Sequence, residues 1–100
     1  MFSKLQQKEH RLQLARHLSR NVKDKNYNHN KFSNCALGYA ARIGIGGLVD
    51  KNHPKLPSSS CFLYEDANTV FGDGAYCNIF AGSRRYNRKE VIEVLRNFKD

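Results

Sequence analysis

The stretch NCALGYAARIGIGG (Asn34–Gly47) decides the fold of this chain. Residues Cys35–Ile43 are too continuously apolar for a surface helix and too rich in alanine for a strand, so they predict a helix that is buried on most sides. Gly38 costs about 1 kcal/mol relative to alanine in a helix interior, and close approach of a neighbouring element is its expected compensation. Ser33 or Asn34 is the predicted N-cap, and the glycines that follow the helix supply the left-handed backbone that ends it.

An amphipathic helix is predicted over Glu9–Val22, before this central helix. Its apolar residues recur at the spacing of one helix face, and its basic residues lie on a different face. The stretch KDKNYNHNK (Lys23–Lys31) that follows predicts turns, because asparagine side chains bond to their own backbone. The chain thus enters the central helix through a polar loop that ends at Phe32, a predicted anchor.

The second half of the chain is predicted to be helical after a long loop. Both prolines and a run of serines lie in Leu48–Ser60, which predicts an exposed connection. The next stretch could hold a short strand, but a helix over Tyr64–Phe71 is favoured, followed by one or two helical turns over Ala75–Gly82. The clearest helix begins at Asn87 as N-cap, with Glu90 completing a capping box. Its apolar stripe consists of Val91, Ile92, Leu95 and Phe98.

Length and spacing together predict one mainly α domain over residues 1–100, a compact single-domain bundle of about four to five short helices with a long central loop. The longest apolar run falls far short of the roughly 20 residues that span a bilayer. The N-terminus lacks the apolar segment of a signal peptide. We therefore expect a cytoplasmic protein without a membrane partner.

The residues that commonly carry catalysis or bind metals do not form a recognisable set. The cysteines are widely spaced without a Cys-x-x-Cys pair, which predicts reduced and mostly buried thiols at Cys35, Cys61 and Cys77. The histidines all lie in polar or helix-surface contexts without a spaced acid or cysteine: His10, His17, His29 and His53. We therefore predict no catalytic residue, no metal site and no cofactor. A small enzyme, or a metal protein that uses one of the cysteines, is kept as an alternative, to be tested by metal analysis and cysteine substitution.

Positive charge is concentrated at the two ends of the chain. The net charge is +8, with a net +6 in residues 1–31, −1 in residues 32–83 and +3 in residues 84–100. A field of one sign steers association with a partner of the opposite sign, and guanidinium groups beside an aromatic ring suit phosphates, carboxylates and stacking. The predicted binding residues are Arg16, Arg20, Lys23 and Lys25 in a first segment, and Arg84, Arg85, Tyr86 and Arg88 in a second. The sequence leaves open whether the two segments form one patch.

Several short motifs, taken together, resemble a group of small uncharacterised bacterial and phage proteins. The matching pieces are LARHL, Phe32, CALGYA with its Cys-(Ala/Ile)-x-Gly-(Trp/Tyr)-Ala pattern, ANTVFG and RKEVIEVLRNF, and they cover most of the chain. The group usually carries Cys-Gly-Thr before the central helix, where this chain has KFSN, so a shared metal or redox role of paired cysteines is not implied. The resemblance implies a compact, mainly helical cytoplasmic domain of phage or mobile-element type, and it carries over no activity and no catalytic residue.

These observations predict a small basic binding protein without enzymatic activity. We expect a phage-type accessory factor that binds and inhibits a host protein with an acidic surface, or a nucleoprotein complex, in counter-defence or host takeover. If phage-encoded, it would act in the host cytoplasm. The assignment to a non-enzymatic binding class follows from the size of the chain, because a small domain without an assembled catalytic set acts more easily by covering a surface than by chemistry. The alternative is direct DNA or RNA binding through the basic N- and C-terminal segments, which predicts affinity that falls steeply with salt.

Overall fold

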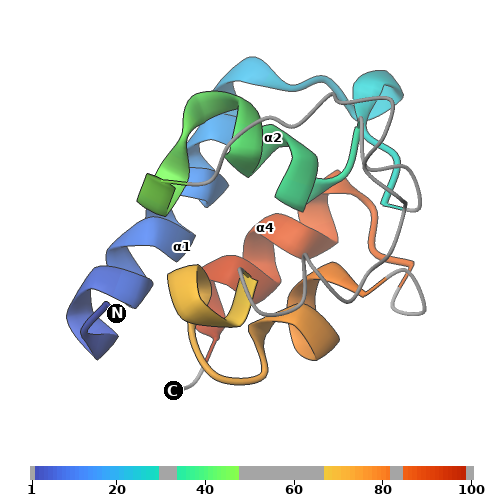
Figure 1. Cartoon of the computed structure of the whole chain (residues 1–100). Coiled ribbons are helices and arrows are strands. Elements are labelled where there is room, and N and C mark those ends of the chain that lie inside the picture. The colour runs from blue at the N-terminus through green and yellow to red at the C-terminus, as the bar shows by residue number, and fades with distance from the viewer. Residues whose placement is uncertain (1, 30–33, 48–66, 82–84, 99–100) are drawn as a thin grey trace, which may run out of the picture.

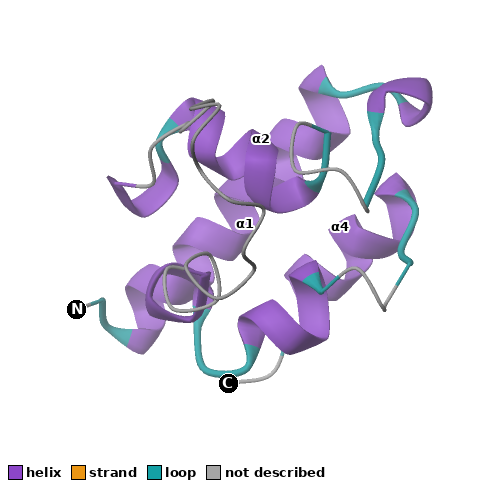
Figure 2. Cartoon of the chain, turned by 45° about the vertical axis from the view of Figure 1, so that its right-hand side comes forward, coloured by secondary structure: helices purple, strands orange, loops and turns teal. Residues whose placement is uncertain are grey.

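The computed structural model describes residues 2–29, 34–47, 67–81 and 85–98, which form helices and connecting turns (Figure 1). In chain order the elements are α1 (Lys4–Asn21), η1 (Asp24–Asn26), α2 (Ala36–Ile43), η2 (Ile45–Gly47), a helical segment at residues 67–71, η3 (Tyr76–Phe80) and α4 (Arg88–Asn97). No strand occurs in this described part of the chain (Figure 2). The mainly α fold class predicted from the sequence is confirmed.

The other elements assemble on α1. Helix α4 packs extensively along α1, α2 and η2 also contact α1, and η3 packs against α4. Because α1 and α4 run in opposite directions, the start of the chain and the end of α4 lie toward the same side of the molecule (Figure 1). At the other side, the end of α1 and the turn η1 come to lie beside the start of α4. This arrangement positions the candidate site described below.

Helix α1 begins earlier than the sequence periodicity predicts. The Ser3 hydroxyl accepts a hydrogen bond from the Gln6 N–H, and the Gln6 side chain accepts one from the Ser3 N–H, which together make a capping box. The predicted start at Glu9 was therefore wrong, because the first turns of the helix are mostly polar and give no apolar period. The apolar face was predicted correctly, since Leu14 and Leu18 are buried in the core.

A buried arginine on α1 was not anticipated. Arg11 is only 1% exposed, its guanidinium donates a hydrogen bond to the Phe71 carbonyl, and it lies 4.7 Å over the centre of the Phe98 ring. Arginine is rarely buried unless its charge is well solvated by the protein. The sequence pattern places basic residues on the outer face of the helix, and only the packing of residues 67–71 and the end of α4 against α1 encloses this one.

Helix α2 is the buried helix that the central stretch predicts. Residues 36–41 are all buried, and the helix ends at Gly44 in the left-handed conformation, with a φ of 73°. Its N-cap is Cys35, whose Sγ accepts a hydrogen bond from a backbone N–H of the first turn at 3.4 Å. Asn34 is thus not the cap, and Ser33 lies outside the described residues. Sulfur is a weak acceptor, so cap preferences favour the oxygen-bearing neighbours over a cysteine.

Helix α4 begins as predicted. The Asn87 side chain accepts a hydrogen bond from the Glu90 N–H at 2.8 Å, and the Glu90 carboxylate accepts one from the Asn87 N–H at 3.1 Å. Of its apolar stripe, Phe98 is half-buried and packs against the core, and three residues are buried: Val91, Ile92 and Leu95. Residues 76–80 form a wide helical turn in which the Ala81 N–H donates to the Tyr76 carbonyl at 2.7 Å. Ile79 and Phe80 point inward there as predicted, and Tyr76 is half-buried.

Other predictions fall partly or wholly outside the described residues. The predicted loop Leu48–Ser60 lies outside them. Of the predicted helix Tyr64–Phe71, residues 67–71 are described and are helical, and the chain then leaves the helix at Gly72 with a φ of 121°. Lys31, Phe32, His53, Cys61 and Arg84 also lie outside.

Candidate functional site

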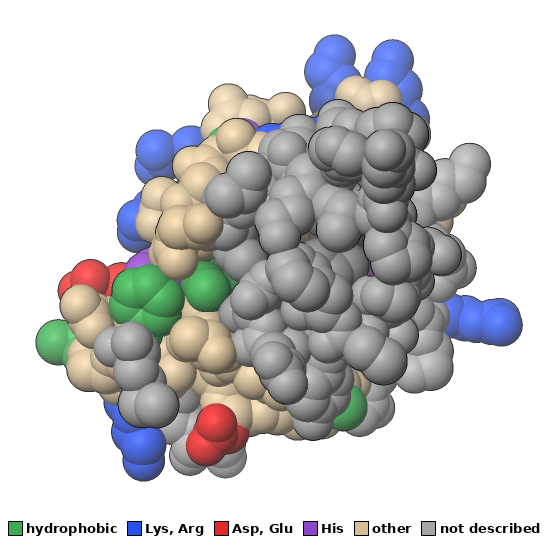
Figure 3. Space-filling view, in the orientation of Figure 1, with side chains coloured by type: hydrophobic (Ala, Val, Ile, Leu, Met, Phe, Trp, Pro, Cys, Tyr) green, Lys and Arg blue, Asp and Glu red, His purple; other side chains and the backbone are tan. Residues whose placement is uncertain are grey.

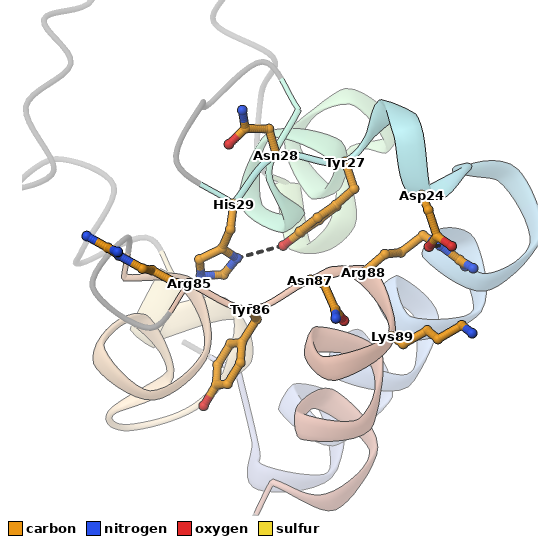
Figure 4. A pocket seen from close by; sticks show the side chains of 9 residues that line it. All are labelled: Asp24, Tyr27, Asn28, His29, Arg85, Tyr86, Asn87, Arg88 and Lys89. Carbon is orange, nitrogen blue, oxygen red and sulfur yellow. Dashed lines mark hydrogen bonds and ion pairs between the residues drawn. The ribbon is translucent and has the colours of Figure 1, made fainter.

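A cleft opens where the end of α1 meets the start of α4. Its walls are the segments 24–29 and 85–89, which are far apart in the chain but face one another (Figure 4). The cleft has a volume of about 590 Å³. The residues that line it are Asp24, Tyr27, Asn28, His29, Arg85, Tyr86, Asn87, Arg88 and Lys89. Because its cationic side chains outnumber its single acid, we call it the basic cleft.

An ion pair joins the two walls of the basic cleft. Arg88 Nε donates to Asp24 Oδ1 at 2.6 Å, and Arg88 Nη1 donates to the Leu18 carbonyl at 3.1 Å. The Arg88 side chain is 16% exposed whereas that of Asp24 is 67% exposed, so the arginine is held against α1 while the acid stays at the surface. The hydrogen bond from Arg88 holds the pKa of Asp24 below its usual value, and the nearby charge of Lys89 lowers it further. The positive charge of Arg88 is thus largely offset within the protein.

A buried histidine, His29, joins three segments of the chain at the cleft. His29 is 6% exposed, and its Nε2 lies 3.1 Å from the Ala81 carbonyl oxygen. Its Nδ1 lies 2.7 Å from the Tyr27 hydroxyl, which in turn accepts a hydrogen bond from the Ala36 N–H at 3.3 Å. The Tyr86 ring stands edge-on to the imidazole, with ring centres 5.6 Å apart. The imidazole therefore connects the loop after η1, the start of α2 and the end of η3.

The partners of His29 determine which of its nitrogens carries the proton. A carbonyl oxygen only accepts hydrogen bonds, so Nε2 carries the hydrogen and donates it to Ala81. Nδ1 then accepts the hydroxyl hydrogen of Tyr27. Burial lowers the pKa of His29 and raises the pKa of Tyr27, so both side chains are uncharged near neutral pH. The middle of the basic cleft is thus neutral, with its hydrogen-bonding groups already paired.

The two remaining cations of the basic cleft are exposed. Arg85 and Lys89 lie on opposite sides of the Tyr27–His29 pair (Figure 4). Neither makes a hydrogen bond or an ion pair with another residue of the described part of the chain. Arg85 has a φ of 51°, which lies in the left-handed region that residues other than glycine rarely occupy. Such backbone conformations are often found at functional sites. These two side chains are the ones available to a ligand.

The structure brings together only some of the predicted binding residues. Arg85, Tyr86 and Arg88 line the basic cleft, whereas Lys23, the N-cap of η1, and Lys25, inside η1, flank Asp24 in the chain but do not themselves line the cleft. The remaining residues of the first segment, Arg16 and Arg20, are exposed on α1 and do not line the cleft, whereas Arg84 lies outside the described residues. On the face shown in Figure 3, the Lys and Arg side chains stand at separate places around the rim rather than in one patch.

Sequence reasoning missed Tyr27 and His29, the two neutral residues in the middle of the cleft. His29 was assigned to a polar context, and this was wrong because the side chain is buried. Tyr27 was not singled out at all. The sequence did carry one signal: an aromatic residue lies two positions before a histidine, inside an asparagine-rich turn. The groups that contact these two side chains come from residues 36, 81 and 86, and local spacing does not reveal such distant contacts.

The cysteines do not form a pair. Cys35 is buried, and burial raises the pKa of its thiol, whereas Cys77 is exposed, which corrects the prediction of mostly buried thiols for that residue. Within the described residues, no group of three or more His, Cys, Asp or Glu side chains is placed to hold a metal ion. Of the helices in these residues, none combines the length and apolar character needed to cross a membrane.

Comparisons with protein-family models, with curated proteins and with solved structures found no match to this chain.

Proposed function

We propose that this chain is a small binding protein without enzymatic activity that docks on the acidic surface of a partner protein and inhibits it by covering that surface. A phage-type accessory factor that acts on a host protein is the biological setting that we propose. The observation that carries the proposal is the Asp24–Arg88 ion pair, because it brings the end of the first basic segment against the start of the second around one cleft.

The state of the buried side chains supports binding rather than catalysis. A general base needs an accessible nitrogen or oxygen within hydrogen-bond reach of a substrate. Both ring nitrogens of His29 are already engaged by Tyr27 and Ala81. The exposed charged groups of the cleft that make no ion pair within the described residues are the cations Arg85 and Lys89, which attract an anionic partner and orient it.

The proposal is tested by capture from a bacterial host lysate, with and without nuclease. We expect a protein partner that survives nuclease and forms a stoichiometric complex in size-exclusion chromatography, and whose activity falls as the complex forms. A variant with Arg85 and Lys89 both changed to Glu should recover less of this partner. Recovery of nucleic acid alone, or loss of every partner after nuclease, would overturn the proposal.

Direct nucleic-acid binding is a second candidate, favoured by the exposed Arg16 and Arg20 on α1 together with Lys23 and Lys25 on the turn that follows. These cations do not line the cleft, and none of them forms an ion pair within the described residues. This candidate predicts affinity that falls steeply with salt, because each neutralised phosphate releases a counterion. A protein partner would give a shallower salt dependence and a discrete complex.

A further inference from the structure

We propose that the basic cleft binds an extended acidic segment of a partner protein, in which two carboxylates separated by an uncharged stretch pair with Arg85 and Lys89. This inference rests on the proposed function and specifies its contact surface. It concerns a protein segment rather than a nucleic acid, and it assigns no role to the basic residues of α1.

The positions of the two exposed cations set the spacing of the ligand's charges. Arg85 lies before the N-cap of α4 and Lys89 lies in its first turn, on opposite sides of the Tyr27–His29 pair (Figure 4). The peptide dipoles of α4 add positive potential at the same place, because the helix N-terminus opens into the cleft. A carboxylate at either end is therefore attracted by a side-chain cation that makes no ion pair within the described residues, and of these two cations Lys89 is the one whose charge also acts on Asp24.

The middle of the cleft sets the character of the ligand between those charges. The half-buried Tyr27 offers an aromatic, uncharged surface there, and the buried His29 to which it is hydrogen-bonded carries no charge either. The Tyr86 ring continues this surface from the opposite wall. An uncharged side chain or backbone can pack there, whereas a charged group would lose hydration without gaining a partner.

The middle of the cleft disfavours a nucleic-acid strand. A phosphate backbone carries a charge at every nucleotide, so a strand that crosses the cleft would also place phosphates beside the neutral Tyr27–His29 pair and the Asp24–Arg88 ion pair. The ion pair adds no net attraction for these phosphates, because its two charges offset one another. Two separate carboxylates on a peptide avoid the problem. The cleft volume of about 590 Å³ suits a few residues of an extended chain.

The test is a titration of the intact chain with a synthetic peptide, followed by two-dimensional NMR and fluorescence anisotropy. The probe peptide has two glutamates separated by a short alanine-serine spacer. Matched peptides carry glutamine in place of one or both glutamates, and a short oligothymidylate is the nucleic-acid probe. We expect backbone shifts around the two walls of the cleft with the first peptide, weaker binding with one glutamate, and none with two glutamines.

Variants identify the contacts. Arg85→Glu and Lys89→Glu should each weaken binding of the acidic peptide roughly tenfold, since each replaces an attraction by a repulsion. Lys8→Glu is the matched control, because Lys8 is also an exposed cation on a helix but does not line the cleft, and it should leave binding unchanged. The double variant Arg85→Glu with Lys89→Glu should bind a peptide in which both glutamates are replaced by lysine. Circular dichroism should show that all variants stay folded.

Three results would overturn the inference. These are absence of binding by the acidic peptide at millimolar concentration, shifts that map to α1 instead of the cleft, and tighter binding of the oligothymidylate at the cleft. The proposed function would survive the first two if the lysate still yields a nuclease-resistant protein complex that Arg16→Glu with Arg20→Glu abolishes. The partner would then dock on the outer face of α1.

Discussion

The substitution Tyr27→Phe removes one oxygen atom and tests the buried hydrogen-bond network directly. The hydroxyl donates to His29 Nδ1 at 2.7 Å and accepts from the Ala36 N–H at 3.3 Å. Without it, a nearly buried imidazole nitrogen lacks a donor and a buried backbone N–H lacks an acceptor, and phenylalanine fills the same space. No other change in packing is expected.

The expected destabilisation follows from these two unpaired groups. A buried polar group that loses its partner costs about 1–3 kcal/mol. The hydrogen bond from the Ala36 N–H is long, so its loss should cost an amount near the lower end of this range. We therefore expect the free energy of unfolding to fall by about 2–3 kcal/mol in total. For a domain of this size that corresponds to a drop in melting temperature of roughly 10–20 °C.

Urea denaturation near neutral pH, followed by circular dichroism, measures this loss. Tyr86→Phe is the matched control, because its hydroxyl makes only a 3.4 Å bond to the Asn78 carbonyl at an exposed position, and its removal should cost less than about 0.5 kcal/mol. If Tyr27→Phe is no more destabilising than Tyr86→Phe, the network does not hold the cleft wall in place and the reasoning is refuted.

Two further predictions concern pH and glycine. Burial lowers the pKa of His29 below its ordinary 6.5, so the unfolded chain takes up a proton that the folded chain excludes; the free energy of unfolding should therefore decline as pH falls through about 6.5. In the variant His29→Gln, the free energies of unfolding measured by denaturant on either side of this pH should differ less. Part of the pH dependence should remain, because burial also lowers the pKa of His17. An unchanged pH dependence would contradict the assignment of a lowered pKa to His29. Gly46→Ala should lower the free energy of unfolding by about 1–3 kcal/mol more than Gly47→Ala does, as measured by thermal denaturation. Both glycines have a positive φ, but only at Gly46 would an added Cβ lie 2.6 Å from Val70 Cγ1. Equal losses would show that the contact relaxes.

Much of the helical framework could be predicted because its determinants are local. The buried central helix follows from an unbroken apolar stretch, and its end follows from a glycine that takes up left-handed backbone at residue 44. The start of α4 follows from the reciprocal bonds of Asn87 and Glu90, which lie three residues apart. The start of α1 was missed for a related reason, because its capping box lies in a polar turn that carries no apolar period. The cap at Cys35 was missed because sulfur is a weak acceptor.

The sequence by itself thus determined the helical class, the central buried helix and the unequal distribution of charge, because residue spacing and composition express these directly. Only the tertiary structure decided which charges meet. Asp24 and Arg88 are 64 residues apart in the chain, and His29 bonds to a carbonyl 52 residues away. These contacts exist because antiparallel packing of α1 and α4 on a shared apolar core brings the end of one helix beside the start of the other. That packing pairs one arginine with an acid, buries a histidine from a polar loop in a neutral state, and leaves Arg85 and Lys89 exposed on either side of it.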